Sequence, residues 1–386
     1  MNVKRILRRF KDQYEVNHTY RFYSEQFKEY LNMHGIPNEP AAGEDDYARL
    51  WKSLSKRVEP YSYRFFSHYM KEEKRKYIVP EDIGHSVIEY YLNPIEYRAF
   101  YKDKNLFSQY LRPKESLPKE LLRRIDGGQF LDGDYQVGSI TRDSSKYDVA
   151  DEYSGIERII IKPSANSCSG SQVKLFHRVF EDDKKSCFVD DNGCPLDGEF
   201  LSRYNYGRNF VLQEAISQHP YISQFCSTSV NTMRLCTYRS VTDESILMFA
   251  AALRIGHEGS VVDNLHAGGG FVKIDVETGK LGHELYDQYG NVSKSINGVN
   301  MDKDFQIPGW KSIYEFGVSI AKQNHHMRLL ALDVALDADN KPRLIEYNCV
   351  EFAFWIPMFT GQQVFGDKME EVLEYCRKRL SHDQRI

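Results

Sequence analysis

A series of short apolar segments in the second half of the chain limits its fold most strongly. From residue 157 onward, β-branched and apolar runs alternate with clusters of Gly, Asn, Asp and Ser, which is typical of strands joined by turns. The predicted strands cover residues 157–162, 172–176, 210–216, 232–240, 246–255, 271–276, 329–336 and 343–348. We expect helices at 104–112, 308–324 and 364–380. Successive hairpin-like strands favour an α+β fold over a regular βαβ alternation.

Residues 1–97 show a different pattern. Charged and aromatic side chains recur there at helical spacing, as in YARLWKSLSKRV (47–58) and EDIGHSVIEYYL (81–92), and β-branched runs are few. We therefore predict a mainly helical N-terminal region at 1–97, followed by α+β units at 98–215 and 216–386. A chain of 386 residues is long enough for each unit to bury a core of its own.

Overall composition excludes several classes of protein. The formal net charge is −4, whereas proteins that bind nucleic acid usually carry an excess of basic residues. No apolar run reaches the ~18 residues that span a bilayer, and the N-terminus has no signal-peptide core. Seven dispersed cysteines without metal-ligand spacing indicate reduced thiols. The sequence predicts a cytoplasmic protein without a nucleic-acid partner.

The first fourteen residues, MNVKRILRRFKDQY, leave two alternatives open. Their apolar side chains follow helical spacing, and Lys and Arg residues form a cationic face. Such a helix can lie on an anionic membrane surface, which would place the protein peripherally at the inner face of the membrane. The more common arrangement is a solvated helix packed on its own domain.

A hairpin near the C-terminus combines apolar strands with acidic residues. LLALDVAL (329–336) and RLIEYN (343–348) flank a run of turn-forming residues. With a symmetric loop that pairs Leu336 with Arg343, Asp333 lies directly opposite Glu346. Because side chains alternate along a strand, Asn348 shares their face. The other face is expected to hold Leu332, Val334, Ile345 and Tyr347.

The facing acids indicate a metal site. Carboxylates on neighbouring strands lie ~5 Å apart and repel each other, and a hard divalent cation removes that repulsion. Mg²⁺ prefers oxygen ligands such as carboxylates, an amide oxygen and the phosphates of a bound nucleotide. The alternative is an edge hairpin whose acids point into water, where carboxylates usually lie.

A Ser-rich loop and several polar residues within apolar runs add to this picture. Lys162 ends a predicted strand, and PSANSCSGS (163–171) follows it, a loop whose backbone N–H groups can approach phosphate oxygens. Such loops are also often mere connections. Polar side chains interrupt later segments at Gln213, Glu214, Arg234 and Arg254, and the stretch 263–270 reads DNLHAGGG. The two arginines need an anionic partner, either a protein carboxylate or a substrate.

In this order, Lys162 with its loop, QEAI, NTMR, DNLHAGGG and the Asp333…Glu346-Tyr-Asn348 set resemble the ATP-grasp superfamily over roughly residues 100–386. DKNLF (103–107), QHP (218–220) and VNTMR (230–234) are most similar to the sugar-transfer-associated ATP-grasp group, which accompanies capsule and exopolysaccharide synthesis genes. The N-terminal third departs from the βαβ pre-grasp domain of many relatives.

The resemblance implies a site in which two α+β subdomains clasp ATP. The residues that it implies for phosphate contact are Lys104, Lys162 and the loop Ser169, Gly170 and Ser171. Those that it implies for the rest of the nucleotide are Gln213, Glu214, Ile216, Asn264, Gly268 and Gly269. The implied Mg²⁺ ligands are Asp333, Glu346 and Asn348. Arg234 and Arg254 are implied to face a phosphate or an acyl intermediate.

The implied activity is that of an ATP-dependent carboxylate–amine ligase. A substrate carboxylate would attack the γ-phosphate, and an amine would then attack the acyl phosphate to form an amide. The expected substrates are small molecules, such as an amino acid and a carboxylated sugar of a surface polysaccharide, and the resemblance implies peripheral contact with membrane or polysaccharide machinery. Two alternatives stay open: a phosphotransferase acting on a sugar or polyol hydroxyl, and a non-catalytic nucleotide-binding module of an assembly complex.

Overall fold

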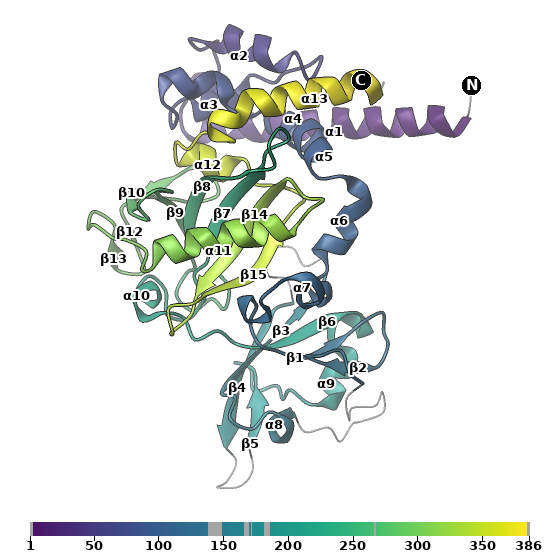
Figure 1. The fold of residues 1–386 in the computed structure, drawn as a ribbon. Coiled ribbons are helices and arrows are strands. Elements are labelled where there is room, and N and C mark those ends of the chain that lie inside the picture. The colour runs from purple at the N-terminus through teal and green to yellow at the C-terminus, as the bar shows by residue number, and fades with distance from the viewer. Residues whose placement is uncertain are drawn as a thin grey trace.

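The computed structural model describes residues 3–137, 149–165, 170, 172–180, 186–265 and 268–383, with side chains from residue 17 to residue 382. Three tiers follow one another in Figure 1: N-terminal helices, a seven-stranded sheet crossed by α11 (Trp310–Gln323), and a six-stranded sheet. The sequence-based prediction of an α+β fold with a helical N-terminal region is confirmed.

The six-stranded sheet contains the first strands of the chain. Its spatial order is β2-β1-β6-β3-β4-β5, and all of its pairs are antiparallel. Its strands are β1 (Glu120–Arg124), β2 (Phe130–Asp132), β3 (Arg158–Pro163), β4 (Lys174–Phe180), β5 (Ser186–Val189) and β6 (Phe210–Glu214). One face packs on α8 (Val149–Glu152) and α9 (Gly198–Arg203) through a core that includes Ile159, Ile161 and Phe210. The opposite face of β3 and β6 is left for other contacts.

The seven-stranded sheet has the order β11-β10-β9-β8-β7-β14-β15, again with antiparallel pairs throughout. Its strands are β7 (Met233–Arg239), β8 (Ile246–Ile255), β9 (Gly270–Ile274), β10 (Leu281–Tyr286), β11 (Val292–Ser293), β14 (Leu329–Leu336) and β15 (Pro342–Asn348). A separate small ribbon joins β12 (Ser295–Ile296) and β13 (Val299–Asn300).

Helices cover both faces of the seven-stranded sheet. α11 packs on one face through a core that includes Leu235, Ile313 and Leu332. The N-terminal helices and the C-terminal helix share a second core on the other face, with Trp51 and Tyr238 among its members. The remaining helices are α1 (Val3–Met33), α2 (Glu44–Trp51), α3 (Tyr61–Phe66), α4 (Glu81–Ile83), α5 (Tyr90–Leu92), α6 (Ile95–Lys102), α7 (Lys104–Tyr110), α10 (Pro220–Ser223), α12 (Trp355–Phe359) and α13 (Met369–Asp383).

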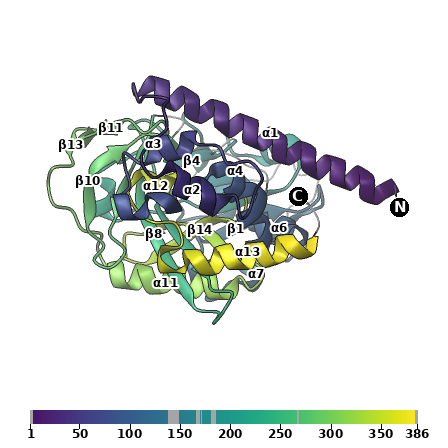
Figure 2. The ribbon, with the colours of Figure 1, turned by 90° about the horizontal axis from the view of Figure 1, so that it is seen from above.

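The helices of the N-terminal region thus pack directly on one face of the seven-stranded sheet. A π-helical segment, Gly84–Glu89, continues α4 into α5 and faces the chain after β15. Figure 2 shows α1 running past the body of the molecule toward the N-terminus. The side chains of residues 1–16, which carry the cationic face considered above, lie outside the described ones. Of the helices in the described part of the chain, none is both long and apolar enough to span a membrane.

The register of the C-terminal hairpin is confirmed at its centre and wrong near its turn. Asp333 pairs with Glu346, as the sequence predicts, but Leu336 pairs with Pro342 rather than with Arg343. The two registers are reconciled by a β-bulge, in which Ile345 has no residue opposite. Leu344 therefore takes the buried position, and Ile345 turns to a cavity instead of the predicted core face.

Candidate active site

A cavity of about 630 Å³ lies between the two large sheets. The six-stranded sheet contributes β3 and β6, and the seven-stranded sheet contributes β7, β8, β14 and β15. Alternation along β3 explains its role, because Ile159 and Ile161 enter the core while Arg158, Ile160 and Lys162 line the cavity. The volume falls in the range of small-molecule sites, roughly 300–1,000 Å³.

Asp333 is the most enclosed charge in this cavity, with 2% of its surface exposed. Its neighbour on β7 is Arg234, the residue paired with it in the sheet. Arg234 donates from Nε to Asp333 Oδ1 (2.6 Å) and from Nη2 to Oδ2 (3.0 Å), and Arg254 Nη1 lies 3.2 Å from Oδ2. Arg254 also pairs with Asp263 at 3.2 Å. Two guanidinium groups therefore compensate a carboxylate that would be costly to bury alone.

Glu346, across the hairpin from Asp333, faces a lysine instead. Lys104 Nζ lies 2.9 Å from Glu346 Oε2. Burial raises the pKa of Glu346, but the charges of Lys104 and Lys162 outweigh it and hold that pKa well below its usual range. Burial, followed by repulsion from Lys104, lowers the pKa of Lys162 to about 8. Two ammonium groups thus lie near one carboxylate, an arrangement that favours the arrival of a further anion.

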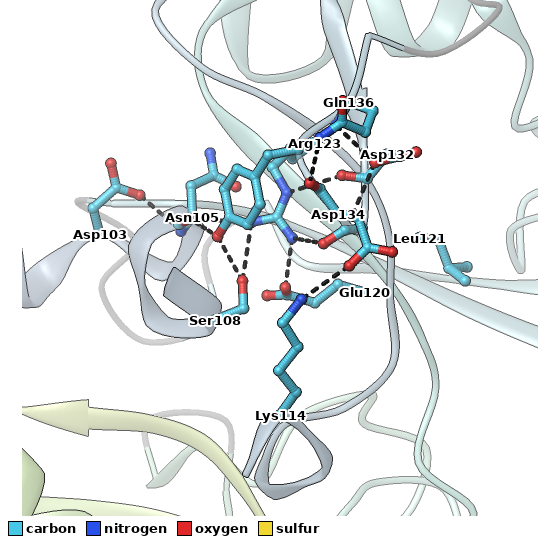
Figure 3. A network of polar contacts seen from close by, with 12 residues as sticks. Asp103, Asn105, Ser108, Lys114, Glu120, Leu121, Arg123, Asp132, Asp134 and Gln136 are labelled. Atoms are coloured by element: carbon cyan, nitrogen blue, oxygen red, sulfur yellow. Dashed lines mark hydrogen bonds and ion pairs between the residues drawn. The ribbon is translucent and has the colours of Figure 1, made fainter. Parts of the chain in front are cut away.

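Lys104 is held in place by a polar network around α7 (Figure 3). Asp103 caps the helix by accepting a hydrogen bond from Asn105 N (2.9 Å). The fully buried Arg123 of β1 donates to Asn105 O (3.0 Å) and pairs with Glu120. The guanidinium of Arg123 also stacks on the Tyr135 ring, 3.8 Å from its centroid. The network fixes the first turn of α7, and hence Lys104, to the six-stranded sheet.

The three residues predicted to bind metal offer two carboxylates and an amide oxygen. These donors suit a Mg²⁺ ion that a nucleotide also binds. Within the described ranges, no group of three or more His, Cys, Asp or Glu side chains is arranged to hold a metal ion. Mg²⁺ commonly uses only one or two carboxylates and takes further oxygens from phosphates and water. Asn348 Nδ2 lies 3.4 Å from Asp333 Oδ2, which leaves its amide oxygen for a ligand. Asp333, Glu346 and Asn348 therefore fit the ion, provided that an anion draws the cations away.

Other predicted nucleotide contacts lie along the same cavity. Gln213, Glu214 and Ile216 line it, and Gln213 Oε1 is buried without a hydrogen-bond partner in the structure. Gly170 also lines it, with φ of 72°, and a Cβ there would lie 3.1 Å from Val262 of the facing unit. Ser169 and Ser171 lie outside the described residues.

The glycines of the DNLHAGGG stretch have a different place from the predicted one. Asn264 lines the cavity, but Gly268 and Gly269 are not part of its lining. They form a tight turn into β9, in which Gly269 N donates to Asn264 O (3.3 Å) and Gly268 has φ of 85°. A Cβ on Gly269 would lie 2.7 Å from Ile255 O. The positive φ favours glycine at position 268, and close backbone packing requires it at position 269.

The sequence analysis missed several residues of the lining. Arg158 could have been found by extending the alternation of β3 back from Lys162. Lys102, Glu351 and Trp355 also line the cavity but lie outside any predicted strand. Their location depends on how α6 and the segment after β15 pack, for which the sequence offered no signal.

Comparison with known proteins identifies a family. A sequence profile described as sugar-transfer associated ATP-grasp matches residues 91–372. No match was found among curated proteins.

Solved structures show distant likeness. D-cycloserine synthetase DcsG has a TM-score of 0.39 and 10% identity, covering 75% of this chain and 73% of its own. The D-alanine–D-alanine ligase from Coxiella burnetii has a TM-score of 0.39 and 8% identity, covering 76% and 62%. The ATP-grasp ligase PsnB, solved with a precursor variant, Mg and ADP, has a TM-score of 0.38 and 11% identity, covering 74% and 61%. The profile match, which spans most of the sequence, shows that the chain belongs to the sugar-transfer associated ATP-grasp family.

Proposed function

We propose that the protein is an ATP-dependent carboxylate–amine ligase that works through an acyl phosphate. The observation that carries this proposal is the cavity in which Arg234, Arg254 and Lys104 hold the acids of the C-terminal hairpin. A triphosphate brings negative charge for which these cations can exchange their carboxylate partners. The freed carboxylates then suit a divalent cation.

Other residues of the lining support a proposal for how the nucleotide is bound. Lys104, Lys162 and Gly170 would contact the phosphates. Gln213, with its unsatisfied buried Oε1, suits a donor such as the adenine amino group, because an orphaned buried acceptor is costly until a ligand satisfies it. Glu214 and Ile216 would border the adenine and ribose. Asp333, Glu346 and Asn348 would hold Mg²⁺, which when bound offsets charge on the transferred phosphoryl group.

The chemistry needs no side-chain nucleophile. A substrate carboxylate oxygen attacks the γ-phosphorus, and the bond to ADP breaks. The amine nitrogen then attacks the acyl carbon, the bond to phosphate breaks, and the nitrogen loses a proton. Cys349, the thiol that lines the cavity among the described residues, is unsuited to attack, since burial and then the Glu89 charge raise its pKa to about 11. Arg234 and Arg254 would stabilise charge on the acyl phosphate.

The substrates proposed are a carboxylated sugar and an amino acid or other amine. The sugar-transfer association of the family supports a role in surface polysaccharide, such as capsule, biosynthesis. That role would place the protein in the cytoplasm, with peripheral contact to membrane or polysaccharide machinery.

The test is ADP release from Mg-ATP with a panel of uronic-acid sugars and amino acids. A ligase releases ADP only when a carboxylate is present, and hydroxylamine traps the acyl phosphate as a hydroxamate. Product mass separates the alternatives, because a ligase joins two molecules with loss of water and a kinase adds a phosphoryl group. ADP release that needs neither a carboxylate nor an amine contradicts the proposal, and ATP binding without any turnover favours a non-catalytic module.

Glu346→Gln tests the metal site directly. We expect turnover to fall by about 100-fold or more while the protein stays folded, because the amide keeps the size of the side chain but loses the charge. Asp339→Asn, an exposed acid in the turn of the same hairpin, is the matched control and should keep full turnover. Equal turnover of the two variants would remove Glu346 from the mechanism.

A further inference from the structure

Glu351 differs from the other acids of the cavity in having no cation beside it. Asp333, Asp263 and Glu346 each pair with Arg or Lys, and Glu214 lies 3.7 Å from Lys119. Across the described part of the chain, the Glu351 carboxylate has neither a hydrogen-bond donor nor an ion-pair partner. Glu351 lines the same cavity, and the residue is exposed. A negative charge on this wall is therefore available to a ligand.

The backbone at Glu351 adopts an uncommon conformation. Its φ is 55°, in the left-handed region that residues other than glycine seldom adopt. Side chains of the N-terminal region fix the chain on both sides of it. Asn93 Nδ2 donates to Cys349 O (2.8 Å), and Glu89 Oε2 accepts from Phe352 N (2.9 Å). An uncommon backbone conformation that is held by such anchors is typical of functional positions.

An aromatic ring completes the wall. Trp355, at the start of α12, lines the cavity and is braced edge-on by Phe271 and Phe359, with centroids 5.6 and 5.9 Å away. Ring faces attract ammonium groups, and Trp does so most strongly. An unpaired carboxylate and a Trp ring on one cavity wall are the elements from which a site for an organic cation is built.

From this juxtaposition, we propose that Glu351 and Trp355 form the subsite that binds the amine co-substrate in its ammonium form, which loses one proton to water before the nitrogen attacks the acyl carbon. The inference rests on the proposed ligase function and names the class of its second substrate, an amine that is cationic at neutral pH. It also gives the N-terminal helices a role, because Glu89 and Asn93 position the segment that carries Glu351.

The test compares two nitrogen nucleophiles in the same assay. With Mg-ATP and a carboxylate from the uronic-acid panel, each of the twenty common amino acids serves as a cationic amine, and hydroxylamine serves as a small amine that is neutral at pH 8. In Glu351→Gln, we expect the KM of the active amino acid to rise at least tenfold more than that of hydroxylamine. Trp355→Leu should change the two KM values in the same sense as Glu351→Gln does. Glu351→Asp should recover part of the affinity for the amino acid that Glu351→Gln loses.

The control is Glu277→Gln, which removes an exposed acid outside the cavity lining and should leave both KM values unchanged. If Glu351→Gln forms hydroxamate and its KM for the amino acid equals that of the wild type, the subsite is overturned and the ligase function stands. If the wild type forms no hydroxamate with any carboxylate, the proposed function falls and the subsite with it.

Discussion

Two of the buried groups of charges in the described part of the chain are organised in opposite ways. In the cavity, Asp333 and Glu346 each meet Arg or Lys side chains, and the ion pairs face an open space. In the N-terminal region, acids outnumber bases: Glu59, Glu81, Asp82 and Glu89 are each at most 4% exposed. His85 lies between two of them, 3.2 Å from Glu81 and 3.1 Å from Glu89.

The two groups respond differently to burial. Burial, and then the Glu59 charge, raise the pKa of Asp82 to about 8, and burial raises that of Glu59 to about 7. Burial lowers the pKa of His85, but Glu81 and Glu89 outweigh it and raise that pKa to about 10. None of these residues lines the cavity. Charges that match and face a cavity can exchange partners with a ligand. Among the enclosed acids, Glu89 instead accepts a hydrogen bond from Phe352 N and so holds its helix to the segment after β15.

The largest effect that would test this comparison is expected for Asp333→Asn. Loss of the carboxylate leaves Arg234 and Arg254 without their shared anion, so we expect the free energy of unfolding to fall by about 3 kcal/mol and turnover to be lost. Urea denaturation measures the first effect and ADP release the second. Because ATP can replace the missing anion, it should stabilise Asp333→Asn more than the wild type. Equal stabilisation would show that the arginines do not exchange partners.

An intermediate effect is expected for Lys162→Met. Loss of a charged phosphate contact should weaken ATP binding by about 10- to 100-fold at pH 7.5. The wild type should also lose affinity as the pH rises above 8, because Lys162 with a pKa of about 8 gives up its proton there. Isothermal titration calorimetry at pH 7.5 and 9 measures both quantities. Lys341→Met, an exposed residue of the β14–β15 turn, should behave like the wild type.

The smallest effect on ligand binding is expected for Asp82→Asn, in the enclosed group. Folded Asp82 keeps its proton up to about pH 8, while the unfolded chain loses it near the ordinary value of 3.8. The folded state thus binds more protons over this range, and stability falls as the pH rises from 4 to 8. Asn cannot ionise, so this fall should be smaller in Asp82→Asn, with unchanged ATP affinity. Thermal unfolding from pH 4 to 8 tests it, and the exposed Glu25→Gln should keep the wild-type slope.

An element could be predicted from the sequence when its own residues carry the pattern that stabilises it. β8 and β14 have the predicted bounds, 246–255 and 329–336, because each is an apolar run with a single charged residue. β1 was missed because Arg123 and Arg124 interrupt its apolar pattern. Both are buried in the structure, where Arg123 pairs with Glu120 and Arg124 donates to the carbonyls of Tyr204 and Arg208. Such compensation comes from distant segments and leaves no local pattern.

The sequence alone determined strands such as β8 and β14 and that Asp333 lies opposite Glu346, since periodicity and hairpin pairing are local. Only the tertiary structure decided which cations pair with these acids. It also decided that Gly268 and Gly269 lie outside the cavity lining and that Glu351 is part of it. Those outcomes depend on contacts between residues that are far apart in the sequence, such as Arg234 and Asp333, and no local periodicity encodes such contacts. A side chain's neighbours are set by packing, and packing is settled only when the whole chain has folded.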